Sequence, residues 1–255
     1  MEETQPPLVP ENSAAQTSLF SRLTNVFVAP TEVFDEIKSS QPKAVNWIVP
    51  LALAVIAGVI YTLVVFSQPA VIQRMRDAQE KKFQEMVDTG KMTQAQADKT
   101  IETVQKYMGP GFLKITGSLG SIATNAAILF LVALVFWGVG VRALHAHFGY
   151  MQAVESVATA TMINVLGTIV ALLLAVIYGN MSMTPGPVLL VSHFDPANKY
   201  HIMLSALSIT AIWYVGVLSI GLARLSGASF AKAAVWLYTI WAVLTFVPIY
   251  FLGGK

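Results

Sequence analysis

LGSIATNAAILFLVALVFWGVGV at Leu119 to Val141 and VATATMINVLGTIVALLLAVIY at Val157 to Tyr178 are two long apolar runs without a charged residue. An α-helix rises about 1.5 Å per residue, so each run is about long enough to cross the ~30 Å of hydrocarbon in a bilayer. Only a short connector, Arg142 to Ser156, joins them. The two runs therefore predict a helical hairpin embedded in a membrane.

Three further uncharged runs have a similar length and composition. They are Trp47 to Phe66, Ile202 to Leu222 and Ala233 to Leu252. In the first of these, Ala54 and Gly58 form a small-xxx-small pair, which lets a neighbouring helix approach closely. Together the runs predict an all-α integral membrane protein built as a bundle of five transmembrane helices.

The overall composition agrees with a membrane protein and excludes several other classes. Charged residues make up only 12% of the 255 residues, whereas soluble domains have about a quarter. The net charge is +2, from 16 Lys and Arg against 14 Asp and Glu, which gives no electrostatic support for binding nucleic acid. The absence of cysteine excludes disulfides, thiolate metal sites and a cysteine nucleophile.

The polar segments divide the rest of the chain. Residues 1–17 are polar and contain proline, which predicts a disordered tail, and residues 18–46 predict interfacial amphipathic helices, the second of them starting at Pro30. Amphipathic helices packed against the protein's own loops are an equally good interpretation. Residues 47–255 form the five-helix membrane domain, in which residues 68–113 predict a soluble helical hairpin between the first and second spans.

The second helix of this hairpin has a clear start signal. Thr93 and Gln96 have the spacing of a capping box, in which each side chain bonds the other residue's backbone N–H. Gly90 precedes them and interrupts the helical pattern. We therefore predict a turn at Gly90 and a helix that begins at Thr93.

A polar stripe runs along the third span. Thr161, Asn164 and Thr168 are spaced i, i+3, i+7, and Asn125 in the second span is a plausible partner. A side-chain amide in hydrocarbon should face protein or water rather than lipid. The stripe is interpreted either as interhelical hydrogen bonding or as a wet cavity that could line a substrate path.

The connector between the second and third spans holds a small group of possible ligands. His145 and His147 are spaced i, i+2 and point to different sides of a helix, so they could bind one metal ion only in an extended turn, with Glu155 as a third ligand. Histidines at the lipid headgroups are the favoured interpretation. Arg142 and Glu155 flank the connector and could form a surface ion pair, which would contribute little.

Known catalytic and cofactor-binding motifs are missing from the sequence. It contains no Gly-rich phosphate loop, no G-x-S-x-G and no H-E-x-x-H. We therefore expect no enzyme activity, no cofactor and no metal.

Four short motifs stand out in the sequence: Phe27 to Ile37, Gly90 to Gln96, Phe148 to Val157 and Gly227 to Ala234. They resemble motifs of the Yip (Ypt/Rab-interacting protein) domain family, bacterial type. Phe27 to Ile37 resembles its F-x-x-P-x-x-x-F-x-x-I opening, and Phe148 to Val157 resembles its Gly-containing connector into the third span. Gly227 to Ala234 is similar to its last connector, and Gly90 to Gln96 is similar to the charged helical insert. The resemblance covers most of the chain after Ser18.

This resemblance implies five helices and a cytoplasmic N-terminus, and so a multi-pass protein of the cell membrane, the bacterial inner membrane. Charge alone does not fix the orientation, because the polar segment after the first span reverses the count of basic residues. With the N-terminus inside, the candidate cytoplasmic-face cluster is Pro30, Phe34, Arg142, His145, His147, Glu155, Arg224 and Lys232. Eukaryotic relatives bind small GTPases, but this chain lacks the long tail expected for that contact.

The sequence therefore predicts a non-enzymatic membrane organiser or adaptor of the Yip type. Its expected partners are the lipid bilayer, a protein at the cytoplasmic face and a second copy of the chain, with no nucleic acid. The alternative is a small-molecule or ion transporter or channel with a weakly polar path lined by Asn125, Thr161, Asn164 and Thr168. No predicted span contains a charged residue or histidine, whereas proton relays and ion-coupled carriers usually have one.

Overall fold

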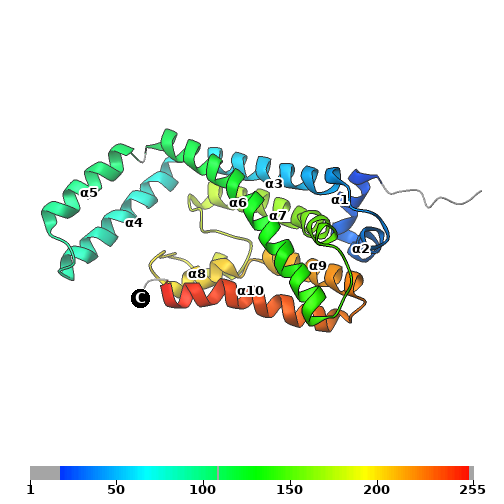
Figure 1. Cartoon of the computed structure of the whole chain (residues 1–255). Coiled ribbons are helices and arrows are strands. Elements are labelled where there is room, and N and C mark those ends of the chain that lie inside the picture. Colours follow the sequence, from blue (N-terminus) through cyan, green and yellow to red (C-terminus); the bar gives the residue numbers. More distant parts are fainter. Residues whose placement is uncertain (1–17, 108, 253–255) are drawn as a thin grey trace, which may run out of the picture.

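Helices make up most of the described part of the chain. The computed structural model describes residues 18–107 and 109–252, and within these ranges the chain forms α-helices, one π-helical turn and one 3₁₀ turn, with no strand (Figure 1). The predicted all-α fold class is confirmed. The tail predicted at residues 1–17 lies outside the described residues.

Five of the described helices are long and apolar enough to cross a membrane. They are α3 (Ala44–Val65), α6 (Pro110–Gly138), α7 (Tyr150–Tyr178), α9 (Ile209–Ser226) and α10 (Phe230–Leu252). A π-helical turn, Val139–Ala143, continues α6. Large apolar side chains such as Leu131, Leu173 and Leu244 point outward from these helices, as lipid-facing residues do.

Helix α7 is the central element of the bundle. It packs against α3, α6 and α9, and its first half is buried through small side chains such as Ala153, Ala158 and Ala160. Small residues let helix backbones come close, which strengthens van der Waals packing where lipid provides no hydrophobic driving force. The small side chains therefore allow α7 to pack against three neighbouring helices at once.

The pair of α3 and α6 shows the close approach predicted from sequence. Ala54 is buried, and a Cβ atom added at Gly58 would lie 2.2 Å from the Ser121 Oγ of α6. Asn125 also borders this contact. The small-xxx-small pair therefore packs against the second span.

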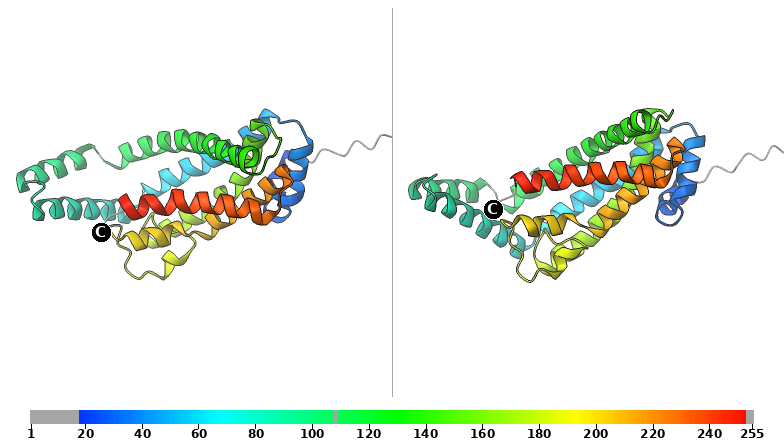
Figure 2. Two further views of the ribbon diagram at one scale, coloured as in Figure 1. Left: turned by 60° about the horizontal axis from the view of Figure 1, so that its bottom comes forward. Right: turned by 90° about the horizontal axis from the view of Figure 1, so that it is seen from below.

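The two polar parts of the chain lie at opposite ends of the bundle (Figures 1 and 2). Helices α1 (Leu19–Val28) and α2 (Pro30–Ser39) lie across one end. Helices α4 (Pro69–Asp88) and α5 (Gln94–Tyr107) form a hairpin that projects from the other end. The connectors α6–α7 and α9–α10 share the end that carries α1 and α2.

The α4–α5 hairpin starts its second helix as predicted. The Thr93 backbone N–H donates to Gln96 Oε1 at 2.9 Å, and the Gln96 backbone N–H donates to Thr93 Oγ1 at 3.3 Å. Gly90 occupies the turn with a φ of +70°, a region that glycine enters without steric cost. The capping box and the predicted turn are both confirmed.

The predicted start of the fourth span is wrong. The run from Ile202 is split into a short helix α8 (Lys199–Ala206) and the spanning helix α9. The break occurs because the backbone N–H of Ile209 donates to the carbonyl of Pro185 at 2.8 Å, and Thr184 Oγ1 donates to the Ser205 carbonyl at 2.7 Å. The loop before α8, which includes a 3₁₀ turn at Pro187–Leu190, thus takes up bonds that a continuous helix would make.

The other four spans all begin earlier than predicted, α3 and α10 by three residues and α6 and α7 by more. Helix α6 starts at Pro110 rather than Leu119, since proline fits the first helical position, where its missing N–H costs nothing. Helix α7 starts at Tyr150 rather than Val157, because the Gln152 side chain accepts from the Gly149 backbone N–H at 3.0 Å. As a result Glu155 lies inside a spanning helix rather than in a connector.

Helix α2 is held against α9 by an aromatic ring packed on a glycine. Phe34 is completely buried, and a Cβ atom added at Gly221 would lie 2.8 Å from Cε1 of its ring. This contact fixes how closely α2 can approach the bundle.

We expect Gly221→Ala to lower the free energy of unfolding by about 1–3 kcal/mol, because the new methyl group forces the buried Phe34 ring away. Thermal stability in detergent, followed by the monodisperse fraction on size exclusion, measures the loss. Gly120→Ala on α6 is the matched control, since nothing lies within 4 Å of a Cβ atom there. Equal stability of the two variants would contradict a tight α2–α9 contact.

Candidate functional site

The candidate site lies at the bundle end that carries α1 and α2. There the structure brings together three segments that are far apart in sequence: the α1–α2 pair, the start of α7 and the turn between α9 and α10. Charged side chains connect all three. They form one buried cluster and one exposed pair beside a groove.

The buried cluster is centred on the carboxylate of Glu155. Arg22 Nη1 and Asn46 Nδ2 both donate to Glu155 Oε1, the latter at 2.7 Å. The backbone N–H of Lys43 donates to Glu155 Oε2 at 3.4 Å. Arg22 Nη2 also donates to Glu36 Oε1 at 2.7 Å. The cluster therefore ties α1, α2 and α3 to α7, and we call it the Glu155 clamp.

The contribution of the Glu155 clamp to the stability of the fold depends on how deeply its charges are buried. Glu155 is completely buried and Arg22 is 5% exposed, while Glu36 is half-buried. Two charges taken out of water attract strongly only if each is well bonded, and removing one partner of a buried pair typically costs about 3–5 kcal/mol. Arg22 Nε is one of the few buried polar atoms without a partner among the described residues. Removing either charge would therefore leave the other one buried without its partner and would strongly destabilise the fold.

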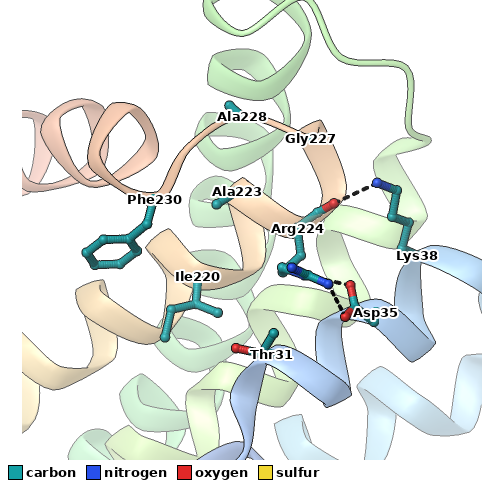
Figure 3. A pocket seen from close by; sticks show the side chains of 9 residues that line it. All are labelled: Thr31, Asp35, Lys38, Ile220, Ala223, Arg224, Gly227, Ala228 and Phe230. Carbon is teal, nitrogen blue, oxygen red and sulfur yellow. Dashed lines mark hydrogen bonds and ion pairs between the residues drawn. The ribbon is translucent and has the colours of Figure 1, made fainter.

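The exposed pair joins α2 to the end of α9. Arg224 Nε donates to Asp35 Oδ1 at 2.7 Å and its Nη2 to Asp35 Oδ2, a bidentate arrangement (Figure 3). Lys38 Nζ donates to the Arg224 carbonyl at 2.9 Å, so a positive charge sits at the negative end of the α9 dipole. Both partners of the pair are almost half exposed, and such pairs contribute about 0–1 kcal/mol.

A groove of about 620 Å³ lies beside this pair. Thr31, Asp35 and Lys38 line it from α2, and Arg224 and Phe230 line it from the α9–α10 side (Figure 3). The Phe230 side chain is 52% exposed. The groove thus presents an aromatic ring, both signs of charge and a hydroxyl group on one surface.

The other residues of the predicted cytoplasmic-face cluster lie at the same end but do not gather. Arg142, in the π-helical turn, and His145 and His147, in the α6–α7 connector, are all exposed. Lys232 is exposed near the start of α10. The pair predicted between Arg142 and Glu155 is wrong, because Glu155 points inward and binds Arg22. In the described part of the chain, no three metal-ligating side chains come together.

The polar stripe lies in the middle of the bundle, away from this end. Asn125, Thr161 and Asn164 line an intramembrane pocket of about 150 Å³, together with Tyr214 of α9. Thr168 does not line it, and its hydroxyl donates to the Asn164 carbonyl within α7 at 2.9 Å. Three of the four predicted stripe residues are therefore brought together.

Sequence reasoning missed Arg22, Asn46 and Asp35. For Arg22 a signal existed, because it falls on the same helical face as the apolar Leu19, Leu23 and Val26. A charged residue on a buried face needs a buried partner of opposite charge. The sequence does not say which one, since Glu155 is 133 residues away.

A family model described as the Yip1 domain matches residues 24–251. The comparison with curated proteins and the comparison with solved structures each find no match. The matched range includes α2, the Glu155 clamp except for Arg22, and every spanning helix.

We expect Glu155→Gln to lower the free energy of unfolding by about 3–5 kcal/mol, because it leaves the buried Arg22 guanidinium without its full counter-charge. Asp35→Asn, which breaks the exposed pair, should cost only about 0–1 kcal/mol. Thermal unfolding in detergent compares the two. The double variant Arg22→Met with Glu155→Leu should recover much of the loss, and no recovery would contradict a direct charge pair.

Proposed function

Since the chain belongs to the Yip1 domain family, we propose that it is a non-enzymatic membrane organiser whose groove between α2 and the α9–α10 turn docks a protein partner. The family and the five apolar helices make it a multi-pass membrane protein. The adaptor role is the step that we add. Catalysis has no support from the geometry, because the charged groups of the clamp are engaged with one another.

The observation that carries this proposal is the rigid attachment of α1 and α2. A short amphipathic pair could lie loosely on the membrane, yet here the buried Glu155 clamp and the Phe34 ring hold it against the bundle. A partner would therefore meet a preformed surface, and binding would lose little conformational entropy in ordering it. Arginine and aromatic residues are the usual anchors of protein interfaces, and Arg224 and Phe230 line the groove.

Transport is the second function that the sequence suggested, and the geometry supports it less. The intramembrane pocket contains Asn125, Thr161 and Asn164 but not Thr168, so the polar lining covers one level of the bundle rather than a continuous path. No charged side chain lines this pocket. The docking groove, by contrast, lies at the bundle end, where a soluble partner could reach it.

We place the groove on the cytoplasmic side. Arg142, Arg224 and Lys232 lie in the helix ends beside the short connectors at this end, and basic residues close to short loops favour the cytoplasm. The projecting α4–α5 hairpin carries more basic residues, which acidic residues do not offset in this rule, so the loop charges alone do not decide the orientation. The family resemblance described above points to the same orientation.

We expect Ala228→Trp to reduce recovery of a co-purifying partner about tenfold or more, because the indole fills the groove without touching the Glu155 clamp. Affinity capture of the full chain from gentle detergent, with bound proteins quantified by mass spectrometry, measures this.

Thr89→Trp, in the turn of the α4–α5 hairpin, is the matched control and should recover the partner normally. Recovery of the same proteins by both variants would contradict docking at the groove. A wild-type chain that reproducibly captures nothing would contradict the adaptor role itself.

The orientation has its own test, because the chain has no cysteine. We expect Phe20→Cys in α1 to resist a membrane-impermeant maleimide in intact cells and Thr89→Cys in the hairpin to react. Both side chains are exposed, so their labelling reports the side of the membrane on which they lie. The opposite pattern would place α1 and α2 outside the cell.

A further inference from the structure

The intramembrane pocket has a feature that interhelical packing does not explain. The side-chain amide of Asn164 forms no hydrogen bond with any residue that the structure describes, although it lines a pocket between four helices. An amide has two donors and an acceptor, and hydrocarbon can satisfy none of them. A polar molecule in the pocket could form hydrogen bonds with this amide.

Asn125, on the facing helix α6, uses only part of its hydrogen-bonding capacity. Its Nδ2 atom donates to the Ser121 carbonyl at 2.9 Å and lies 3.3 Å from Ser121 Oγ. Its Oδ1 atom accepts no hydrogen bond within the described part of the chain. Asn125 and Asn164 therefore form no hydrogen bond with each other, although an interhelical hydrogen bond between α6 and α7 would require one.

A hydroxyl pair closes the polar side of the pocket. Thr161 on α7 and Tyr214 on α9 both line the pocket, and the Thr161 hydroxyl also donates to the Val157 carbonyl of its own helix at 2.9 Å. Apolar side chains, including Leu51 of α3, make up much of the remaining wall. The lining thus offers donors and acceptors of hydrogen bonds on an apolar background, as small-molecule sites do.

Charge and size restrict what could bind here. None of the lining residues is ionised, so an ion would find no counter-charge and would pay its full desolvation cost. A volume of about 150 Å³ has room for several water molecules. The occupant should be small and neutral and should both donate and accept hydrogen bonds, which describes a hydroxylated group.

We propose that this pocket is a hydrated intramembrane site that binds a neutral polyol group. The group can be a free polyol that enters from water or the glycerol end of a neutral lipid, whose chains would lie among the lipid-facing side chains. The site is separate from the docking groove, and its occupancy does not depend on any protein partner.

Two single-cysteine variants of the cysteine-free full chain test hydration. Leu51→Cys places a thiol in the pocket, while Leu53→Cys places one on the outer face of the same helix at a similar depth. In phosphatidylcholine nanodiscs we expect N-ethylmaleimide to modify Leu51→Cys about tenfold faster, because a thiol surrounded by hydrocarbon forms little thiolate. Adding Asn164→Leu to Leu51→Cys should slow it toward the control, with size exclusion verifying that the variants remain folded.

Binding is tested by protection of the same thiol. Glycerol added to the buffer should slow modification of Leu51→Cys if the free polyol is the ligand, and dioleoylglycerol in the nanodisc should slow it if the lipid is. Neither probe should affect Leu53→Cys. Equal modification rates for the two cysteines would show that the pocket is dry and would overturn the proposal. Fast modification of Leu51→Cys that neither probe slows would show that the pocket holds only water and would overturn the polyol-binding site.

Discussion

A carboxylate buried at the end of a membrane helix is the constraint on which this structure depends. Glu155 has no access to solvent, and an isolated charge in such a place would be prohibitively costly. Arg22, Asn46 and the backbone at Lys43 supply its bonds, and each comes from the chain that precedes α7. These bonds hold α1 and the start of α3 against α7, and Arg22 extends the cluster to α2 through Glu36.

The protein is held together by two different kinds of contact, one between the spanning helices and one at the bundle end that carries the Glu155 clamp. Between the spanning helices, contacts are made by small residues and by close backbone approach, as at Gly58, and these are suited to lipid surroundings. At the bundle end, charge pairs and a buried aromatic ring hold segments that would otherwise lie loosely in the interface. The groove lies where these two regions meet, because α2 contributes one wall and the α9–α10 turn the other.

Much of the architecture could be predicted from sequence, because hydrocarbon imposes simple requirements. Five uncharged runs led to five spanning helices, and the Thr93 and Gln96 pair led to a correct helix start. The split between α8 and α9 could not be predicted, since it depends on the Pro185 carbonyl reaching a backbone N–H in a distant segment. The inward turn of Glu155 was missed for the same reason: residue type and spacing do not reveal a partner more than a hundred residues away.

The long sequence separation within the clamp has a consequence for how the protein is made. Arg22 leaves the ribosome early, but Glu155 follows only after two membrane helices and the α4–α5 hairpin have been synthesised. The N-terminal helices therefore cannot complete their docking until α7 has been made, because Arg22 has no buried Glu155 carboxylate to bind before then. Docking of the oldest segment is thus a late step of assembly, since α9, on which α2 also packs, is synthesised later still.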